Sequence, residues 1–145
     1  MSRPITCIDT SEILEGNVEQ VRKAIVDLAA FVEANEPDVI AYQVFIDESS
    51  TSMTVVQIHS DPASMERHLD AARPVFAPFE GLVRLATIDV YGDPSERLLD
   101  QLRRKATMLG DATTTVHRLE AGFARFTRQG AEPGPTVVSG RVQRC

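Results

Sequence analysis

The residue types in this sequence that can do acid–base chemistry gather between Ile40 and His68. Two of the three histidines, His59 and His68, lie in the second half of that stretch. Imidazole titrates near neutral pH, which suits histidine to act as a general base. His68 stands beside Leu69 on the apolar stripe of a predicted helix, so we expect it to face the edge of a cavity as a catalytic base. A histidine that is hydrogen-bonded at the domain surface is the alternative for this position.

Roles are also predicted for five further side chains around the same stretch. Tyr42 lies in a predicted strand and is a second catalytic candidate, because its hydroxyl can donate to an oxyanion. His59 can orient a ligand, and Arg73 can hold an anionic group of a substrate. Phe76 and Phe79 can sandwich an aromatic substrate. Each has a structural alternative: a half-buried tyrosine in a sheet, a histidine that fixes a loop, a salt bridge at a rim, and two phenylalanines in the core.

Several other kinds of site are not expected. His59 and His68 are separated by a loop and have no identified third ligand, so no metal site is predicted. The sequence contains no P-loop, GxGxxG, GxSxG or HExxH motif, which argues against nucleotide-dependent, hydrolase and zinc-protease functions. The two cysteines, Cys7 and Cys145, lie near opposite ends of the chain, and Cys7 is expected to be a small core residue.

Strand patterns, capping residues and prolines predict the hairpin and the helices that position these residues. Residues 40–47 and 52–59 are predicted strands, joined by a polar turn. Asp61-Pro62 is typical of a helix start, and Pro74 and Pro78 predict a break followed by a second short helix. A helix from Val18 to Val32 follows Asn17, which we expect to form a capping box with Gln20 three residues later; Pro37 ends this helix.

The remaining elements are predicted in the same way. A first strand runs from Ile5 to Leu14, and a fourth covers residues 84–91. Asp93-Pro94-Ser95-Glu96 opens a further helix that ends at Gly110. Its Arg103-Arg104-Lys105 cluster is expected on the solvated face. A strand is predicted for residues 113–119, which residues 123–126 continue or pair with, and the tail from Arg128 to Cys145 is expected to be mobile or held by a partner.

This order of elements is β-α-β-β-α-β, the α+β, ferredoxin-like arrangement of an antiparallel sheet with helices on one face. Residues 1–92 make the ferredoxin-like domain, and residues 93–145 add a helix and a strand-like extension to the same globular unit. The uncovered face of the sheet would expose Val, Ile or Phe side chains. We therefore expect a homodimer in which two such sheets stack.

Composition limits the partners. The chain has 145 residues and a formal net charge of −6, which argues against a nucleic acid as partner. No apolar run approaches the roughly 20 residues that span a bilayer, and the first residues do not resemble a signal peptide. We expect a cytoplasmic protein with no membrane partner.

Two segments, EANEPDVIAYQVFIDE and TVVQIHSDPASMERHLD, are followed by a short helix that carries phenylalanines. Together with the order of elements, they resemble the antibiotic biosynthesis monooxygenase-like family of dimeric α/β barrels. The resemblance covers about residues 1–92. It implies a cavity between sheet and helices, and oxygenation of an electron-rich aromatic without metal or flavin. The family's recurring histidine corresponds to His68, whereas the tryptophans of its haem-degrading and some anthrone-oxidising members are missing, since the sequence has no Trp.

Three functional hypotheses follow. The first is a cofactor-independent monooxygenase that acts on a quinol, an anthrone-like compound or another polyphenol. The second is a non-catalytic dimeric module that binds a small ligand or a partner chain. The third is an isomerase or lyase, because proton abstraction alone needs the same base without oxygen.

Overall fold

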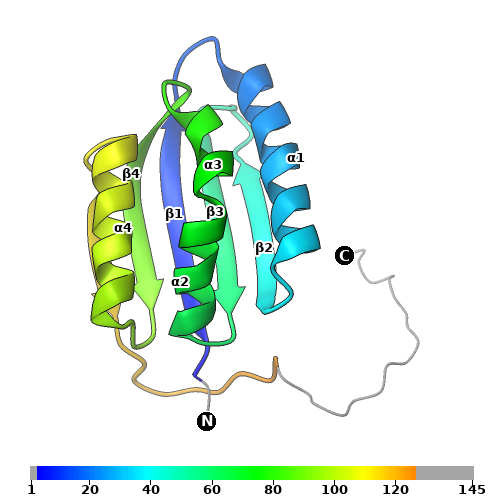
Figure 1. The fold of residues 1–145 in the computed structure, drawn as a ribbon. Helices are drawn as coiled ribbons and strands as arrows, with labels where there is room; N and C mark the ends of the chain where they lie inside the picture. The colour runs from blue at the N-terminus through cyan, green and yellow to red at the C-terminus, as the bar shows by residue number, and fades with distance from the viewer. Residues whose placement is uncertain (1–2, 127–145) are drawn as a thin grey trace.

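A five-stranded sheet with helices packed on one face makes up the protein (Figure 1). The structure, a computed structural model, describes residues 3–126. In chain order the elements are β1 (Ile5–Ile13), α1 (Val18–Asn35), β2 (Val39–Ile46), β3 (Ser52–His59), α2 (Pro62–Ala71), α3 (Arg73–Phe76), the 3-10 turn η1 (Ala77–Phe79), β4 (Val83–Tyr91), α4 (Glu96–Leu109) and β5 (Thr113–His117).

The sheet has the order β2-β3-β1-β4-β5. The first four strands pair antiparallel, and β5 pairs parallel with β4 because the chain crosses over through α4 between them. The predicted α+β, ferredoxin-like fold is therefore confirmed. The appended helix and strand are also present, and they widen the sheet by one strand on the β4 edge.

The hairpin between β2 and β3 has the predicted turn, which the carboxylate of Asp47 stabilises. Asp47 accepts hydrogen bonds from the backbone N–H groups of Thr51 and Ser52, each at 2.9 Å, and from the Ser49 hydroxyl at 2.6 Å. The bond from Ser49, followed by the backbone bond from Ser52, lowers the pKa of Asp47 to about 2. This turn fixes the register in which the two strands pair.

Two of the three predicted N-terminal helix caps form. The Asp61 side chain accepts from the N–H of Ser64 at 2.8 Å, and the Ser95 hydroxyl accepts from the N–H of Leu98 at 3.0 Å. The predicted capping box at Asn17 is wrong. Its backbone (φ −107°, ψ 4°) is not in the extended region that an N-cap residue uses, and its side chain makes no cap hydrogen bond.

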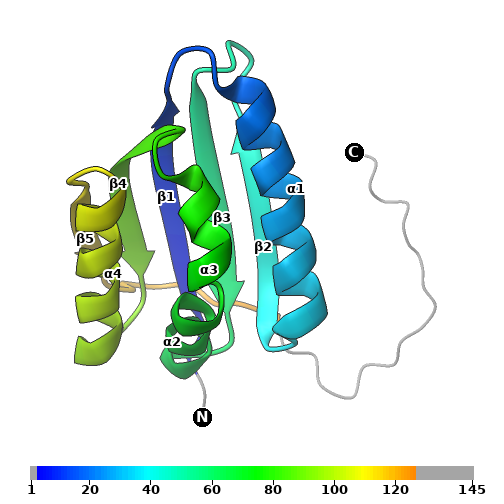
Figure 2. The same ribbon diagram turned by 45° about the horizontal axis from the view of Figure 1, so that its top comes forward.

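The chain between α2 and β4 bends as the prolines predicted. Helix α2 ends at Ala71, and α3 and η1 then carry Phe76 and Phe79 back over the sheet. Figures 1 and 2 show α2 and α3 in the middle of the helical layer, between α1 and α4. These short elements therefore lie above the central strands, where they place two aromatic rings.

The predicted last strand is shorter in the structure. Strand β5 ends at His117, so residues 118 and 119 lie outside it, and residues 123–126 form no strand. One reason is Gly122, whose φ of +130° is a turn conformation rather than an extended one. The predicted tail from Arg128 to Cys145 lies outside the described residues. Within residues 3–126, no helix has the length and apolarity needed to cross a membrane.

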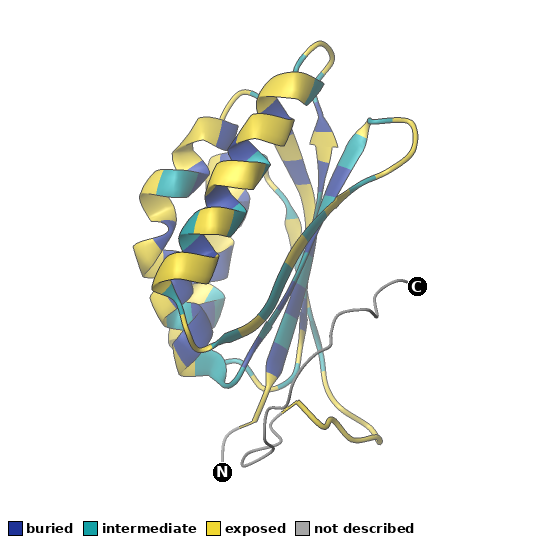
Figure 3. Ribbon diagram, turned by 90° about the vertical axis from the view of Figure 1, so that its right-hand side faces the viewer, coloured by how far each residue is buried: buried dark blue, intermediate teal, exposed yellow. Residues whose placement is uncertain are grey.

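The two faces of the sheet differ, as Figure 3 shows. Alternating residues of β1, β3 and β4 point toward the helices and are buried, and those of the edge strand β2 are partly buried. The other face has no covering layer within the described chain. On β1 the buried set is Ile5, Cys7, Asp9, Ser11 and Ile13. A carboxylate thus lies in the middle of a helix-facing row whose only other polar member is Ser11.

Candidate active site

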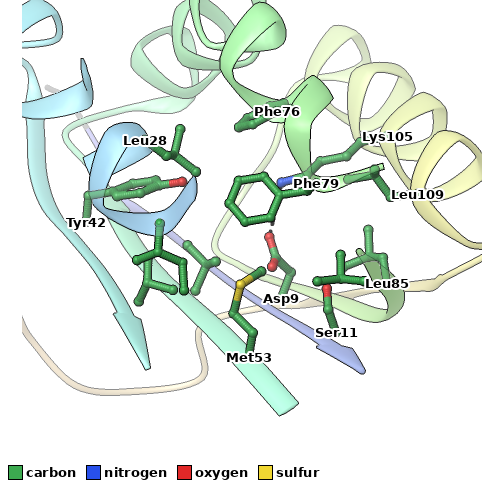
Figure 4. Close-up of a pocket in the computed structure, with 14 residues that line it drawn as sticks. Asp9, Ser11, Leu28, Tyr42, Met53, Phe76, Phe79, Leu85, Lys105 and Leu109 are labelled. Atoms are coloured by element: carbon green, nitrogen blue, oxygen red, sulfur yellow. Dashed lines mark hydrogen bonds and ion pairs between the residues drawn. The ribbon is translucent and has the colours of Figure 1, made fainter. Parts of the chain in front are cut away.

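A cavity lies between the sheet and the helical layer, directly over that carboxylate (Figure 4). Its volume is about 30 Å³, which is room for roughly two water molecules. Strands supply the floor, and α1, α3, η1 and α4 supply the walls. The lining residues are Asp9, Ser11, Ile25, Leu28, Tyr42, Val44, Met53, Val55, Phe76, Phe79, Val83, Leu85, Lys105 and Leu109.

Asp9 forms a buried ion pair with Lys105 at the edge of the cavity. The Asp9 Oδ2 and Lys105 Nζ atoms are 3.2 Å apart, and their side chains are only 3% and 11% exposed. Lys105 Nζ also lies 4.6 Å from the centroid of the Phe76 ring, within range of a cation–π interaction. The pair joins β1 to α4, so the C-terminal helix contributes a charged group to this cavity.

Sequence reasoning missed both members of this pair. The placement of Lys105 on a solvated face is wrong, although its neighbours Arg103 and Arg104 are exposed. The missed signal was spacing: Lys105 follows Leu102 by three residues and precedes Leu109 by four, and both leucines are buried. The alternation of β1 likewise indicates that Asp9 faces the buried side of the sheet.

Tyr42 points its hydroxyl into the cavity (Figure 4). Burial raises the pKa of this phenol well above its ordinary value, and the nearby negative charges of Asp9 and Glu36 raise it further. Tyr42 therefore keeps its proton across the physiological pH range. It can donate a hydrogen bond to a ligand in the cavity but cannot act there as a base.

His68 lies behind this wall and does not line the cavity. It is fully buried, which rules out the alternative of a surface histidine. Its Nδ1 lies 2.7 Å from Glu36 Oε1, and its ring packs against Tyr42 and Phe76 at centroid distances of 5.4 and 5.6 Å. Its Nε2 is buried and has no hydrogen-bond partner among the described residues. His68 thus contacts two residues of the cavity wall from the far side.

His59 does not line the cavity either, and it holds the start of α2. Its Nδ1 lies 2.9 Å from Ser64 Oγ, and its Nε2 lies 2.8 Å from Gln57 Oε1. An amide oxygen only accepts, so Nε2–H donates to Gln57 and Nδ1 accepts from the Ser64 hydroxyl. Burial, followed by the proximity of His68, lowers the pKa of His59 to about 3, so the ring is neutral.

Of the remaining predicted site residues, the two phenylalanines line the cavity and the arginine does not. Phe76 and Phe79 are buried and line the cavity, as a ring-binding role requires. Arg73 is exposed at the start of α3 and is not among the lining residues. The structure therefore brings Tyr42, Phe76 and Phe79 together with Asp9 and Lys105. Within residues 3–126, no three His, Cys, Asp or Glu side chains gather to hold a metal ion.

The same fold occurs in several solved structures. MupZ from Pseudomonas fluorescens superposes with a TM-score of 0.67 at 20% identity, over 90% of this chain and 95% of MupZ. A protein from Caulobacter crescentus assigned as an antibiotic biosynthesis monooxygenase gives 0.56 at 20% identity, over 61% of this chain and 88% of that one. SnoaB from Streptomyces nogalater, a cofactor-independent oxygenase, gives 0.55 at 13% identity, over 65% and 96%. No family model and no curated protein matches the sequence.

The chain therefore has the fold of antibiotic biosynthesis monooxygenase-like proteins, in agreement with the resemblance in its sequence. The C. crescentus protein and SnoaB match 61% and 65% of this chain, a share similar in length to residues 1–92, whereas the match to MupZ takes in 90% of the chain and therefore extends beyond residue 92. At these identities the likeness is one of fold.

Proposed function

We propose that this protein is a monooxygenase that acts, without metal or flavin, on a small electron-rich aromatic compound such as a quinol or an anthrone. The observation that supports the proposal is the composition of the cavity. Phe76 and Phe79 offer apolar ring faces, and Tyr42, Asp9 and Lys105 place polar groups around the same space. An aromatic ring with an ionisable hydroxyl or an acidic C–H matches both kinds of group.

Such a substrate supplies electrons directly to dioxygen. For an anthrone, the methylene carbon becomes a carbonyl: it gains one oxygen atom of O₂, and the other oxygen leaves as water with the two hydrogens. The protein must help to remove a proton and must stabilise the anion that forms. Tyr42 suits the second task, because its raised pKa keeps its hydroxyl available as a donor.

His68 affects the cavity through the rings of Tyr42 and Phe76, which lie between its imidazole and the cavity. It packs against both Tyr42 and Phe76, and Glu36 holds its Nδ1. We propose His68 as the residue that positions these two rings. The prediction that His68 is itself the base requires one of the rings to move aside when substrate enters.

The size of the cavity also matters. About 30 Å³ is too little for an aromatic ring, so α3 and η1 must shift outward with Phe76 and Phe79 when a substrate binds. The same small volume favours the second candidate function, a non-catalytic module that binds a small ligand or a partner chain.

The homodimer remains part of the proposal, with a second copy of this chain on the uncovered sheet face. That face mixes threonines with apolar side chains, of which Phe45 is 53% exposed and Tyr91 40% exposed. The segment after β5 adds Leu119 and Phe123, which are 77% and 78% exposed. A two-fold arrangement would cover these groups on both copies at once.

Oxygen uptake tests the function. Wild type, Tyr42→Phe and His68→Gln are compared in metal-free buffer against a panel of hydroquinones and anthrones. We expect saturable uptake by wild type and a fall in kcat of about 100-fold in Tyr42→Phe, the typical loss for one oxyanion donor. Thr107→Val is the matched control, because it removes an exposed hydroxyl from α4. A flat trace across the whole panel would reject the monooxygenase and favour the binding module.

A further inference from the structure

We propose that Asp9 and Lys105 are the proton-transfer pair of the cavity. In this proposal the Asp9 carboxylate accepts a proton from an acidic C–H or O–H next to an aromatic ring, and the Lys105 ammonium then pairs with the anion that forms. The inference rests on the proposed function and deepens it, because it names the base and restricts the substrate to enolisable or phenolic aromatics.

The first support is that the pair faces the cavity and that the Asp9 carboxylate can accept further hydrogen bonds. Lys105 is the one side chain among residues 3–126 that hydrogen-bonds to the Asp9 carboxylate, and it does so through Oδ2. A carboxylate has about four acceptor positions over its two oxygens. Since both side chains line the same cavity, a ligand there can reach the carboxylate and the ammonium together.

The second support is energetic. Removing two charges from water has a large desolvation penalty, which a buried pair recovers only with good geometry and additional hydrogen bonds. Asp9 and Lys105 have one hydrogen bond between them, and their surroundings include Phe76, Leu85 and Leu109. Apolar residues of similar volume often stabilise a fold at least as well as a buried ion pair, so packing is a weak explanation for this pair. Buried charges in a cavity are typical of functional sites.

The third support is that Tyr42 converges on the same place. The charge of Asp9 contributes to raising the pKa of Tyr42, which indicates that the two groups are close enough to interact across the cavity. An anion formed beside Lys105 would therefore have a second donor in the Tyr42 hydroxyl. Two donors and one acceptor are the groups that enolisation requires.

The step itself transfers one proton and no electrons. The C–H or O–H bond of the substrate breaks, its electron pair stays on the substrate, and a new O–H bond forms on Asp9. Lys105 changes its partner from the carboxylate to the new anion. In the presence of dioxygen the anion is oxidised, and in its absence the proton returns from the carboxyl, after exchange with solvent.

Deuterium exchange under argon tests this step without oxygenation. Anthrone and 2-tetralone are incubated with the full-length protein in D₂O, and loss of the methylene signal is followed by proton NMR. We expect wild type to accelerate exchange above the buffer rate and Asp9→Asn to reduce it to that rate. Lys105→Met should lower the exchange rate at least 10-fold.

The double variant Asp9→Asn/Lys105→Met keeps the test independent of folding, because it removes both charges and leaves none unpaired. Glu12→Gln and Arg97→Met are matched controls, since they neutralise exposed charges on β1 and α4 outside the cavity. The double variant should fold and show exchange at the buffer rate, and both controls should match wild type. Exchange that persists in the double variant, or no exchange by wild type, would overturn the pair's role. Exchange without oxygen uptake would instead reject the monooxygenase and leave the pair's role standing.

Discussion

His68 Nδ1 lies 2.7 Å from Glu36 Oε1, and this contact joins α2 to the residue that follows α1. Both groups are nearly or completely buried, with side-chain exposures of 0% and 9%. Because the carboxylate accepts from Nδ1–H, it fixes the orientation of the imidazole against Tyr42 and Phe76. The geometry of the cavity wall therefore depends on Glu36, for which the sequence predicted no role.

Loss of this acceptor should destabilise the protein. Glu36→Ala leaves a buried N–H without a partner, and we expect the free energy of unfolding to fall by about 2 kcal/mol. Glu36→Gln should lose less, because an amide oxygen can still accept from Nδ1–H. Urea unfolding measures both variants. Equal stability of wild type and Glu36→Ala would show that the contact is not formed in solution.

His59 should make the protein sensitive to mild acid. Its pKa is lowered to about 3 in the fold and is near 6.5 in an unfolded chain. Between these values the unfolded state binds a proton that the folded state does not, so the contribution of His59 is fully present above pH 6.5 and is lost as the pH falls. Its slope is about 1.4 kcal/mol per pH unit.

The measurement compares urea unfolding of wild type and His59→Gln from pH 7 to pH 5. This variant keeps a polar side chain and removes the titrating ring. We expect a clearly flatter pH dependence in His59→Gln than in wild type. Parallel curves would mean that His59 is protonated in the folded state as readily as in the unfolded one.

The sequence was sufficient for the fold, because the fold is encoded by local patterns that the tertiary structure respects. The alternation in β3 and the Asp61-Pro62 start of α2 both predicted elements that form where expected. The capping box at Asn17 failed, since a side-chain cap also depends on backbone angles that residue types do not set. Strand bounds and helix starts were thus predictable where a strong local signal fixed them.

The site was only partly predictable, for a different reason. Tyr42, Phe76 and Phe79 were identified from their types and reach the cavity, but the Asp9–Lys105 pair joins residues that are 96 positions apart. The pattern of β1 places Asp9 on the buried face, and the pattern of α4 does the same for Lys105. Neither pattern says that the two side chains meet, since their contact depends on how α4 lies across the sheet.

Gly110 should be essential for the packing of α4 against β4. Its φ is +142°, and an added Cβ would lie 2.7 Å from Arg84 Cγ and 3.0 Å from the Leu85 backbone. Gly110→Ala therefore combines backbone strain with a clash against β4, and we expect a loss of about 2 kcal/mol in unfolding free energy. Gly16→Ala is the control, because its φ of +87° is also strained but nothing lies within 4 Å of the added Cβ. Chemical denaturation should rank Gly110→Ala as clearly the less stable variant.

The uncovered sheet face leads to the last prediction, which concerns the proposed homodimer. Phe45 lies on β2 and points away from the helices, and 53% of it is exposed in a single chain. Phe45→Glu would place a charge in the contact and, by symmetry, a second charge from the other copy, so the dimer should dissociate. Val26, on α1, is 66% exposed on the helical side, and Val26→Glu is the matched control. Light scattering coupled to size-exclusion chromatography should give a dimer for wild type and Val26→Glu and a folded monomer for Phe45→Glu. A wild-type monomer at high concentration would contradict the stacking of two sheets. A dimer that survives Phe45→Glu would place the interface on another surface of the molecule.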